Sequence, residues 1–312
     1  MSEIETSDLL GLSAPLTKLV ETAAAGIGRL YEPTHIRRMA KAKVEEINLI
    51  SEAIRQNPEL PVKYEDGKLV LDGTDCTELA RRAQERFLFQ EFKKQNNLDH
   101  IVAEAAKTLD ETPSVDARKV DDDWISHFFD AAAHVSNEEM QKVWGKVLAG
   151  EITSGGSYSI RTIELLKTFD QNDAILLSKI ASLFLFGDRL CFIPSNENFL
   201  KKWGVSYDNL LKLGNSGMIN IHPFQQFLFR LGNNGCGTIK NNNDWLIVIN
   251  NGNKEFTVKY GAYFLTQAAI ELHKLVLPKG NHDYMRELVE DIKKSNPNGS
   301  EISYQLQLSS TE

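Results

Sequence analysis

Residues 136–152 read SNEEMQKVWGKVLAGEI, and this stretch decides the fold class that we expect. Ser136 and Glu139 have the spacing of a capping box, in which two side chains satisfy free backbone N–H groups at the start of a helix. The sequence therefore predicts a helix from Met140 to Ile152.

Helices are also predicted on both sides of this stretch. Residues 124–135 precede it, and residues 160–169 and 173–186 follow it, the last with Asp170 as its N-cap. Farther upstream we expect a helix over 74–95, another over 98–109, and a short hairpin over 62–71 around the favoured turn pair Asp66-Gly67. In helix 74–95 the residues predicted to be buried are Leu79, Ala83, Phe87 (or Leu88) and Phe92.

The N-terminal region predicts two amphipathic helices, over 16–31 and 34–54. The first has an apolar stripe with interior glycines, each of which costs about 1 kcal/mol relative to alanine, so something other than helix propensity favours them. The second begins with cations and ends with Glu45, Glu46 and Glu52, the reverse of what the helix dipole prefers. We predict a membrane or oligomer contact from Leu16, Leu19, Val20, Ala23, Gly26, Ile27 and Leu30, and a basic contact patch from Arg29, Arg37, Arg38, Lys41 and Lys43.

The character of the chain changes near residue 190. Strands are predicted at 191–194 and 218–222, short helices at 198–203 and 206–213, and a hairpin joins 244–249 to 255–259 through Asn250–Asn253. Helices over 265–277 and 282–293 follow, and the last twenty residues are expected to be weakly attached. The order of elements from 173 to 277 is that of a winged-helix module.

These elements predict a mainly α fold, α+β overall, with four parts. They are a tail and amphipathic Gly/Ala helix (1–33), a helical domain with a possible short hairpin (34–169), a winged-helix-like domain (170–278), and a C-terminal helix and tail (279–312).

Composition excludes several classes of protein. The 312 residues carry 35 Lys and Arg against 43 Asp and Glu, a net charge of −8, so we do not expect nucleic acid as a partner. The three cysteines are far apart and without a CxxC motif, which excludes a disulfide framework and fits a reducing cytosol. Neither a secretory signal nor a membrane-spanning run of about 18 apolar residues is visible. We expect a cytoplasmic protein that can also lie at the periphery of the inner membrane.

Two blocks of sequence resemble a known group of proteins. The first joins residues 12–21 to GIGRLYEPTHIRR at 26–38 and AKAK at 40–43, and the second joins VWGKVLAGEI at 143–152 to SIRTIELLK at 159–167. They resemble a bacterial family of unknown function, related to the abortive-infection alpha proteins. The resemblance implies a role in defence against phage, and it implies no catalytic residues.

Candidate chemistry is weaker than the structural alternatives. Asp121–Asp123 is better explained as an N-terminal helix cluster than as a metal site. His127 and His134 share a helix face but lie roughly 10 Å apart, too far to bind one ion. The glycines at 232–237 lead into a hairpin rather than a phosphate-binding helix, and no cysteine has a nucleophile signature. We therefore expect no metal, no cofactor and no enzymatic activity.

The N-terminal helix leaves three alternatives open: an anionic membrane surface, self-association or partner binding, and packing within its own domain. Our leading hypothesis is a non-enzymatic, abortive-infection-like protein that forms a homo-oligomer, senses a phage protein and acts by assembly, with membrane disruption by this helix. The alternative is a winged-helix DNA-binding regulator. Its recognition helix, 206–213, carries Lys212 as its one cation, and Asp208 would repel phosphate.

Overall fold

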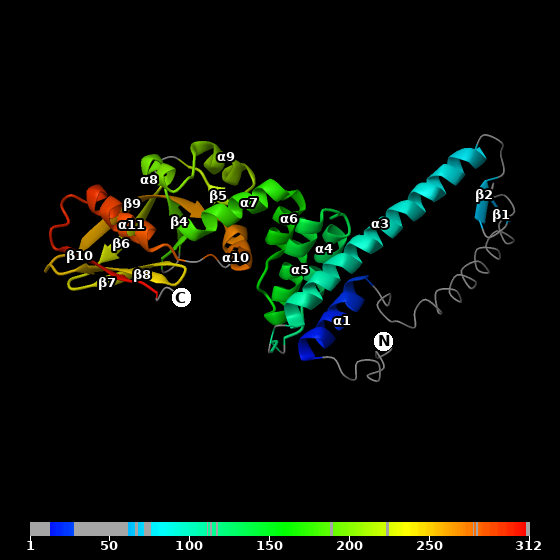
Figure 1. Cartoon of the computed structure of the whole chain (residues 1–312), viewed down its shortest axis with the longest axis horizontal. Helices are drawn as coiled ribbons and strands as arrows, with labels where there is room; N and C mark the ends of the chain where they lie inside the picture. Colours follow the sequence, from blue (N-terminus) through cyan, green and yellow to red (C-terminus); the bar gives the residue numbers. More distant parts are fainter. Residues whose placement is uncertain are drawn as a thin grey trace. The chain divides into compact units, whose positions relative to one another are not determined.

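The computed structural model describes residues 13–27, 62–65, 68–71, 76–110, 112, 114–116, 118–187, 190–222, 225–276, 278 and 280–309, with the side chains of 62–80 and 84 left out. The chain divides into two compact units, residues 1–157 and 158–312 (Figure 1). It is mainly helical and contains an antiparallel sheet of eight strands, which confirms the α+β class at this level.

The first unit is a helical bundle with a two-stranded hairpin. Its elements are α1 (Ala14–Ile27), β1 (Val62–Glu65), β2 (Lys68–Leu71), α3 (Cys76–Asp110), α4 (Asp122–Ala132) and α5 (Glu138–Thr153). The predicted hairpin is present, with Glu65 opposite Lys68.

One helix, α3, replaces the two that were predicted over 74–95 and 98–109. The polar residues between the two predicted helices include neither Gly nor Pro, so nothing in them ends a helix. Asn97 is buried there, and its Nδ2 donates to the carbonyl oxygen of Ala133 at 2.8 Å. Asn97, a polar residue between the two predicted helices, instead forms a hydrogen bond that joins α3 to the end of α4.

The core of this unit is aromatic. Trp124 stacks on Phe128 with 4.9 Å between ring centroids, and Phe128 lies 5.3 Å from the ring of Trp144 on α5. Trp144 and Phe128 have no exposed surface. Trp124 and Phe128 of α4 therefore form one buried aromatic cluster with Trp144 of α5.

The helix starts of this unit follow capping chemistry. Asp121 accepts a hydrogen bond from the backbone N–H of Trp124 at 2.9 Å, as expected for an N-cap. At α5 the cap is Asn137, whose Oδ1 accepts from Met140 N, and not the predicted Ser136. Both residues can cap, and the hydroxyl of Ser136 is instead bonded to Asn97 Nδ2 at 3.3 Å.

The second unit combines helices with the large sheet. In chain order it contains α6 (Ile160–Thr168), α7 (Gln171–Ile180), the 3-10 turn η3 (Ala181–Leu183), β3 (Leu185–Phe186), β4 (Cys191–Pro194), α8 (Glu197–Lys202), α9 (Tyr207–Asn215), β5 (Ile219–Asn220), β6 (Gln226–Leu231), β7 (Cys236–Asn241), β8 (Asp244–Asn250), β9 (Phe256–Leu265), α10 (Gln267–Val276), α11 (His282–Ser295) and β10 (Ile302–Gln307). Asp170 is the N-cap of α7, as predicted, and forms a full capping box with Asp173, but the helix ends at Ile180 and not at residue 186.

The sheet has the strand order β10-β8-β7-β3-β4-β9-β5, with β6 also paired to β9. The predicted hairpin between residues 244–249 and 255–259 is wrong, because β8 pairs with β7 and β10 while β9 pairs with β4, β5 and β6. Asn250 explains the difference: it is buried, and its Nδ2 donates to the carbonyls of Gly232 and Lys254. These bonds lead the chain from one part of the sheet to another rather than into a tight turn.

The C-terminal residues are part of this unit. Strand β10 pairs with β8 along its full length, so the prediction of a weakly attached tail is wrong for residues 302–307. Helix α11 contacts β8, β9 and β10. Its Tyr284 is fully buried and donates its hydroxyl to the carbonyl of Leu183 at 2.9 Å.

The short helices and strands predicted from 190 to 222 are present. The strands among them belong to a sheet of eight strands, whereas a winged-helix module has only a few strands. The winged-helix prediction is therefore not confirmed.

Candidate functional site

Helix α1 carries six of the seven residues that we predicted to contact a membrane or another copy; Leu30 lies outside the described residues. The helix packs against α3, α4 and α5, and Leu19 and Ala23 are buried. Leu16, Val20, Gly26 and Ile27 are partly exposed. The apolar stripe therefore packs within its own unit, which is the third of the alternatives left open by the sequence. Contact of this stripe with a membrane or with another copy stays a prediction.

Two further contacts hold α1 in place. Lys18 Nζ donates to the backbone carbonyls of Ile152 at 2.7 Å and Asp116 at 2.9 Å, which are acceptors at the end of α5 and in the loop before α4. A charged donor bonded to two carbonyls contributes more than a neutral one. Lys18 therefore anchors α1 to the rest of the unit.

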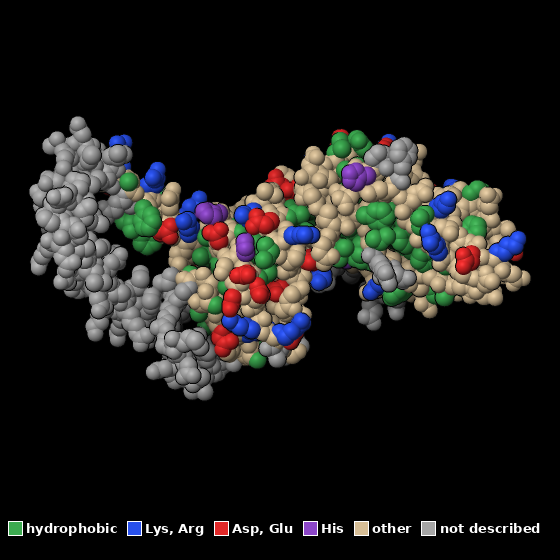
Figure 2. Space-filling model, turned by 180° about the vertical axis from the view of Figure 1, so that it is seen from behind, with side chains coloured by type: hydrophobic (Ala, Val, Ile, Leu, Met, Phe, Trp, Pro, Cys, Tyr) green, Lys and Arg blue, Asp and Glu red, His purple; other side chains and the backbone are tan. Residues whose placement is uncertain are grey.

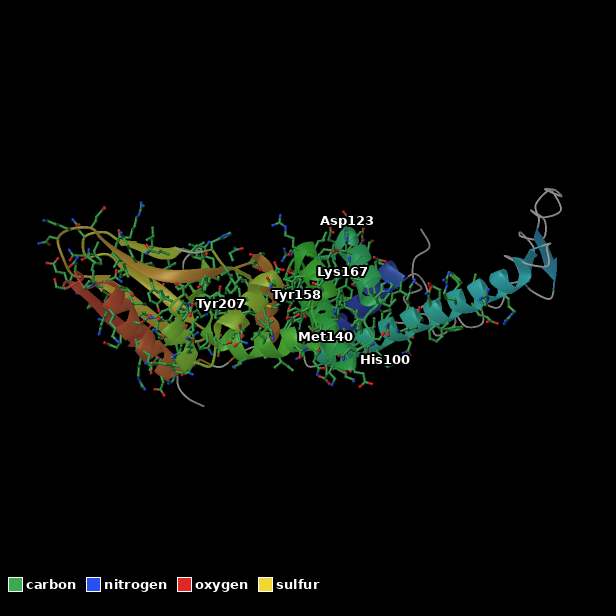
Figure 3. The ribbon with its side chains drawn as sticks, turned by 90° about the horizontal axis from the view of Figure 1, so that it is seen from above. His100, Asp123, Met140, Tyr158, Lys167 and Tyr207 are labelled. Atoms are coloured by element: carbon green, nitrogen blue, oxygen red, sulfur yellow. The ribbon has the colours of Figure 1, made fainter. Side chains whose placement is uncertain are left out.

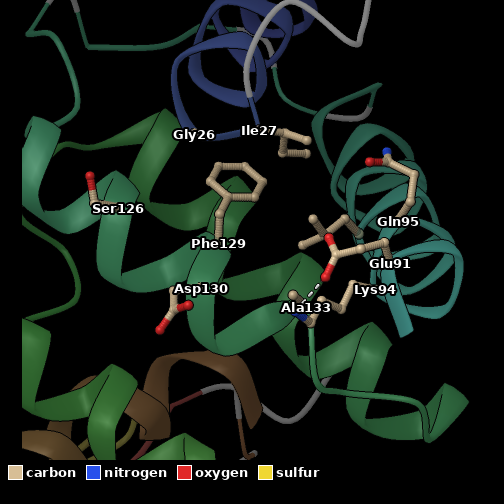
Figure 4. A pocket seen from close by; sticks show the side chains of 10 residues that line it. Gly26, Ile27, Glu91, Lys94, Gln95, Ser126, Phe129, Asp130 and Ala133 are labelled. Atoms are coloured by element: carbon tan, nitrogen blue, oxygen red, sulfur yellow. Dashed lines mark hydrogen bonds and ion pairs between the residues drawn. The ribbon is translucent and has the colours of Figure 1, made fainter. Parts of the chain in front are cut away.

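The C-terminal end of α1 lies directly over the ring of Phe129 on α4 (Figure 4). A β-carbon added to Gly26 would lie 2.0 Å from Phe129 Cδ2, so only glycine allows this approach. The close approach of α1 to Phe129 explains why a glycine stands at this position although glycine has a low helix propensity. Beside the contact is an open cavity of about 400 Å³, lined by residues of α1, α3 and α4 that include Glu91, Lys94 and Asp130.

The predicted basic patch cannot be placed. Arg29, Arg37, Arg38, Lys41 and Lys43 lie outside the described residues, as does the second predicted amphipathic helix. The candidate site is therefore built from the described part of the first unit.

Among the described residues of this unit, the exposed large apolar side chains lie together on the N-terminal half of α3. Phe87, Phe89 and Phe92 are 61%, 70% and 74% exposed, and Leu88 is 43% exposed. The prediction that Phe87 (or Leu88) and Phe92 are buried is wrong. Figure 2 shows hydrophobic side chains gathered on this part of the helix beside Lys and Arg.

Helical spacing divides these side chains between two faces. Phe87 lies on the line that continues to the buried Leu98, Ile101 and Ala105, which pack against the bundle. Leu88, Phe89 and Phe92 lie within an arc of about 100° on another side of the helix; we call these three residues the aromatic face. The predicted buried series, which joined Phe87 (or Leu88) to Phe92, combined residues from these two faces into one apolar stripe.

Charged side chains flank the aromatic face. Arg86 and Lys93 are three residues before and four after Phe89, and so adjoin it on the helix surface. Glu85 lies on the same side and accepts a hydrogen bond from Arg81, and Glu91 pairs with Lys94 at 2.8 Å. Such pairs each stabilise a helix by about 0.3–0.5 kcal/mol, so they support α3 where few neighbours do.

The exposed rings are costly. Burying one phenylalanine side chain stabilises a protein by about 1.5–3 kcal/mol, and here three remain in contact with water. A helix with apolar residues on more than one side is normally enclosed by neighbours. The arrangement is typical of a surface that a partner covers.

The candidate metal-binding residues Asp121–Asp123, His127 and His134 lie in the described part of the chain. No group of three His, Cys, Asp or Glu side chains is placed to hold a metal ion there. Asp121 is an N-cap, in agreement with the helix-cluster interpretation. Burial raises the pKa of Cys191 to about 11, which keeps its thiol protonated and unreactive.

Within the described ranges, the helices lack the combination of length and hydropathy that a bilayer crossing requires. In Figure 3, His100 of α3 lies near Met140 of α5. The Nδ1 atom of His100 is 3.3 Å from Oε1 of Gln141, also on α5.

The predicted recognition helix corresponds to α9. Its apolar residues Leu210 and Leu213 are buried, while Tyr207 is 46% exposed. Lys240 lies in β7, and its Nζ is 5.3 Å from the ring centre of Trp245. These residues do not form a cluster of cations suited to phosphate contacts.

Residues of the second sequence block have structural roles. Ser159 N, Ser159 Oγ and Thr162 Oγ1 all donate to Oε2 of the buried Glu271 on α10, at 2.7, 3.1 and 2.5 Å. Gly145 lets α5 approach α3, because a β-carbon there would lie 2.6 Å from Glu104 Cβ. These three residues of the block therefore contribute to the packing of helices.

Comparison with known proteins gives one match. Residues 81–189 match a family described as a protein of unknown function (DUF2806), from within α3 to beyond β3. No curated protein and no solved structure is similar to the chain.

Proposed function

We propose that the protein is a non-enzymatic bacterial defence protein of the abortive-infection type, and that it acts by assembly through the aromatic face of α3. The defence role depends on the resemblance of the two sequence blocks alone. The observation that supports assembly is the exposure of Phe89 and Phe92 by 70% and 74% on one side of a helix. Exposed aromatic clusters of this kind mark protein interaction sites.

The proposal places the contact on α3 rather than on α1. Leu19 and Ala23 of α1 already face the bundle, and Lys18 is bonded to two of its carbonyls. Membrane disruption by α1 would first require all these contacts to break. The aromatic face needs no such rearrangement, because it is exposed where it lies.

The test is the double substitution Phe89→Ser with Phe92→Ser. We expect it to reduce self-association at least tenfold, because it removes the apolar area that a partner would bury. Light scattering at several protein concentrations measures the mass, and protection of cells against phage measures the function. The matched control is Ile175→Ser, which removes a side chain that is 61% exposed on α7.

Equal mass and protection in the wild type and the double variant would refute the proposal. Loss of both in the control as well would show a general loss of solubility, and this also counts against a specific role for α3. Circular dichroism establishes that the helical content is unchanged.

A winged-helix DNA-binding regulator stays the alternative prediction. It requires cations on α9, where the candidate residue is Lys212 beside Asp208. A gel-shift titration tests it, since affinity based on phosphate contacts falls steeply as salt increases.

A further inference from the structure

The exposed side of α3 has a regular spacing. Its residues recur at intervals of three and four, as in the contact seam of a coiled coil. They are Arg82, Glu85, Phe89, Phe92, Asn96 and Asp99, and all six are exposed. We call these six residues the α3 seam.

The α3 seam is accessible from outside the unit. At about 100° per residue it lies roughly 150° around the helix from the buried residues that pack on the bundle. Those residues are Leu98, Ile101, Val102, Ala105 and Leu109. A second helix could therefore lie along the seam without displacing α4 or α5.

The α3 seam is complementary to a second copy of itself that runs in the opposite direction. In an antiparallel pair centred between Phe89 and Phe92, each Phe89 meets Phe92 of the second copy. Glu85 then meets Asn96, and Arg82 meets Asp99. Aromatic rings occupy the middle, hydrogen-bonding groups follow, and opposite charges close both ends.

We propose that the α3 seam binds the α3 seam of a second copy of this chain in this antiparallel register. The inference rests on the proposed function, and it adds the identity of the partner and the geometry of the contact. The paired segment, residues 82–99, is about 26 Å long at 1.5 Å per residue. Burial of four phenylalanine rings supplies the favourable free energy, and the charges select the register.

A parallel pair is disfavoured by the same charges. It would place Arg82 against Arg82, Glu85 against Glu85 and Asp99 against Asp99, three repulsive contacts. In the antiparallel pair, the Arg82–Arg82 and Asp99–Asp99 contacts are replaced by two identical ion pairs between Arg82 and Asp99.

One flank of the antiparallel pair is repulsive. Arg86 and Lys93 lie on the same side of the seam, so Arg86 approaches Lys93 of the second copy. This repulsion between Arg86 and Lys93 weakens the dimer, so its removal should strengthen the dimer. Replacing Arg86 by glutamate should strengthen the dimer, since it creates two Glu–Lys pairs.

An anionic membrane predicts the opposite sign. Removal of a cation from a helix that binds anionic lipid weakens binding. The seam also includes the acidic residues Glu85 and Asp99, which such a surface would repel. The observations therefore favour a second copy.

The experiment measures the dimer dissociation constant of the full-length chain by sedimentation equilibrium. Arg82→Asp and Asp99→Arg each remove two ion pairs and should weaken the dimer about threefold to thirtyfold. The combined variant restores the pairs with reversed charge, and we expect its dissociation constant to return to that of the wild type. Arg86→Glu should lower the dissociation constant about threefold to thirtyfold.

Lys107→Glu is the matched control for the charge change, because Lys107 lies on α3 outside residues 82–99. Its dissociation constant should equal that of the wild type. Vesicles of anionic lipid and of neutral lipid are tested with the same variants by flotation.

The outcomes separate the two proposals. If Phe89→Ser with Phe92→Ser abolishes association but the Arg82 and Asp99 changes fail to compensate, α3 binds and the antiparallel register is wrong. If neither set changes association, the proposed function fails as well. Weaker association of Arg86→Glu, with loss of flotation on anionic vesicles, would overturn the second-copy inference in favour of a membrane.

Discussion

Gly26 shows how one residue joins two helices. In an isolated helix, replacing glycine by alanine gains about 1 kcal/mol. Here the added methyl group would lie within 2.8 Å of three atoms of the Phe129 ring. We expect Gly26→Ala to lower the free energy of unfolding by about 1–3 kcal/mol, the usual cost of overpacking. Urea denaturation followed by tryptophan fluorescence measures this change.

The control for this prediction is the same substitution in a Phe129→Leu background. A smaller side chain at residue 129 makes room for the methyl group, so the two substitutions should cost less together than the sum of their separate effects. Additive effects would contradict the contact.

His273 makes the second unit sensitive to acid. It lies between Phe184 and Phe186, with ring centroids 5.3 and 5.1 Å away, and burial lowers its pKa below the ordinary value near 6.5. Above that value the side chain is neutral in both the folded and unfolded states. As pH falls below about 6.5, the unfolded state binds the proton first and the folded state loses relative stability.

We therefore expect the urea midpoint to fall between pH 7.5 and pH 5.5, and the fall to be smaller in His273→Phe. This variant keeps an aromatic ring between the two phenylalanines and removes the titrating group. His222→Gln, which changes an exposed histidine, is the control. An identical pH dependence in the wild type and His273→Phe would contradict the assignment.

At the scale of elements, the sequence could predict most helices, because caps and apolar periodicity are local signals. Asp121 and Asp170 begin helices as their residue types indicate. The pairing of strands could not be predicted in the same way. The signal for a hairpin at residues 250–253 was local, whereas the bonds of Asn250 to Gly232 and Lys254 depend on the folded sheet.

Helix α3 marks the limit of prediction for the site. Its C-terminal half follows a single buried stripe, and its N-terminal half carries apolar residues on a second side. Periodicity alone cannot decide between burial in the same chain and burial by another molecule. Only the positions of α4 and α5 along α3 reveal that Phe89 and Phe92 have no cover among the described residues.

At the scale of the whole molecule, the two units differ in what they present. The second unit packs one side of α11, including the fully buried Tyr284, against its sheet, and its buried carboxylate Glu271 is hydrogen-bonded. The first unit packs one side of α1 against α3, α4 and α5 and leaves the aromatic face of α3 exposed. We infer that assembly belongs to the first unit, through α3.

Disulfide trapping tests this central claim most directly. In a full-length chain with Cys76, Cys191 and Cys236 changed to serine, cysteines replace Glu85 and Asn96, singly and together. The antiparallel seam places residue 85 opposite residue 96 of the second copy and separates the two copies of residue 85 by about 16 Å, or 11 residues. We expect mild oxidation to form covalent dimers with the double variant or an equal mixture of the single variants. Dimers formed by either single variant alone, or none with the double variant, would contradict the account.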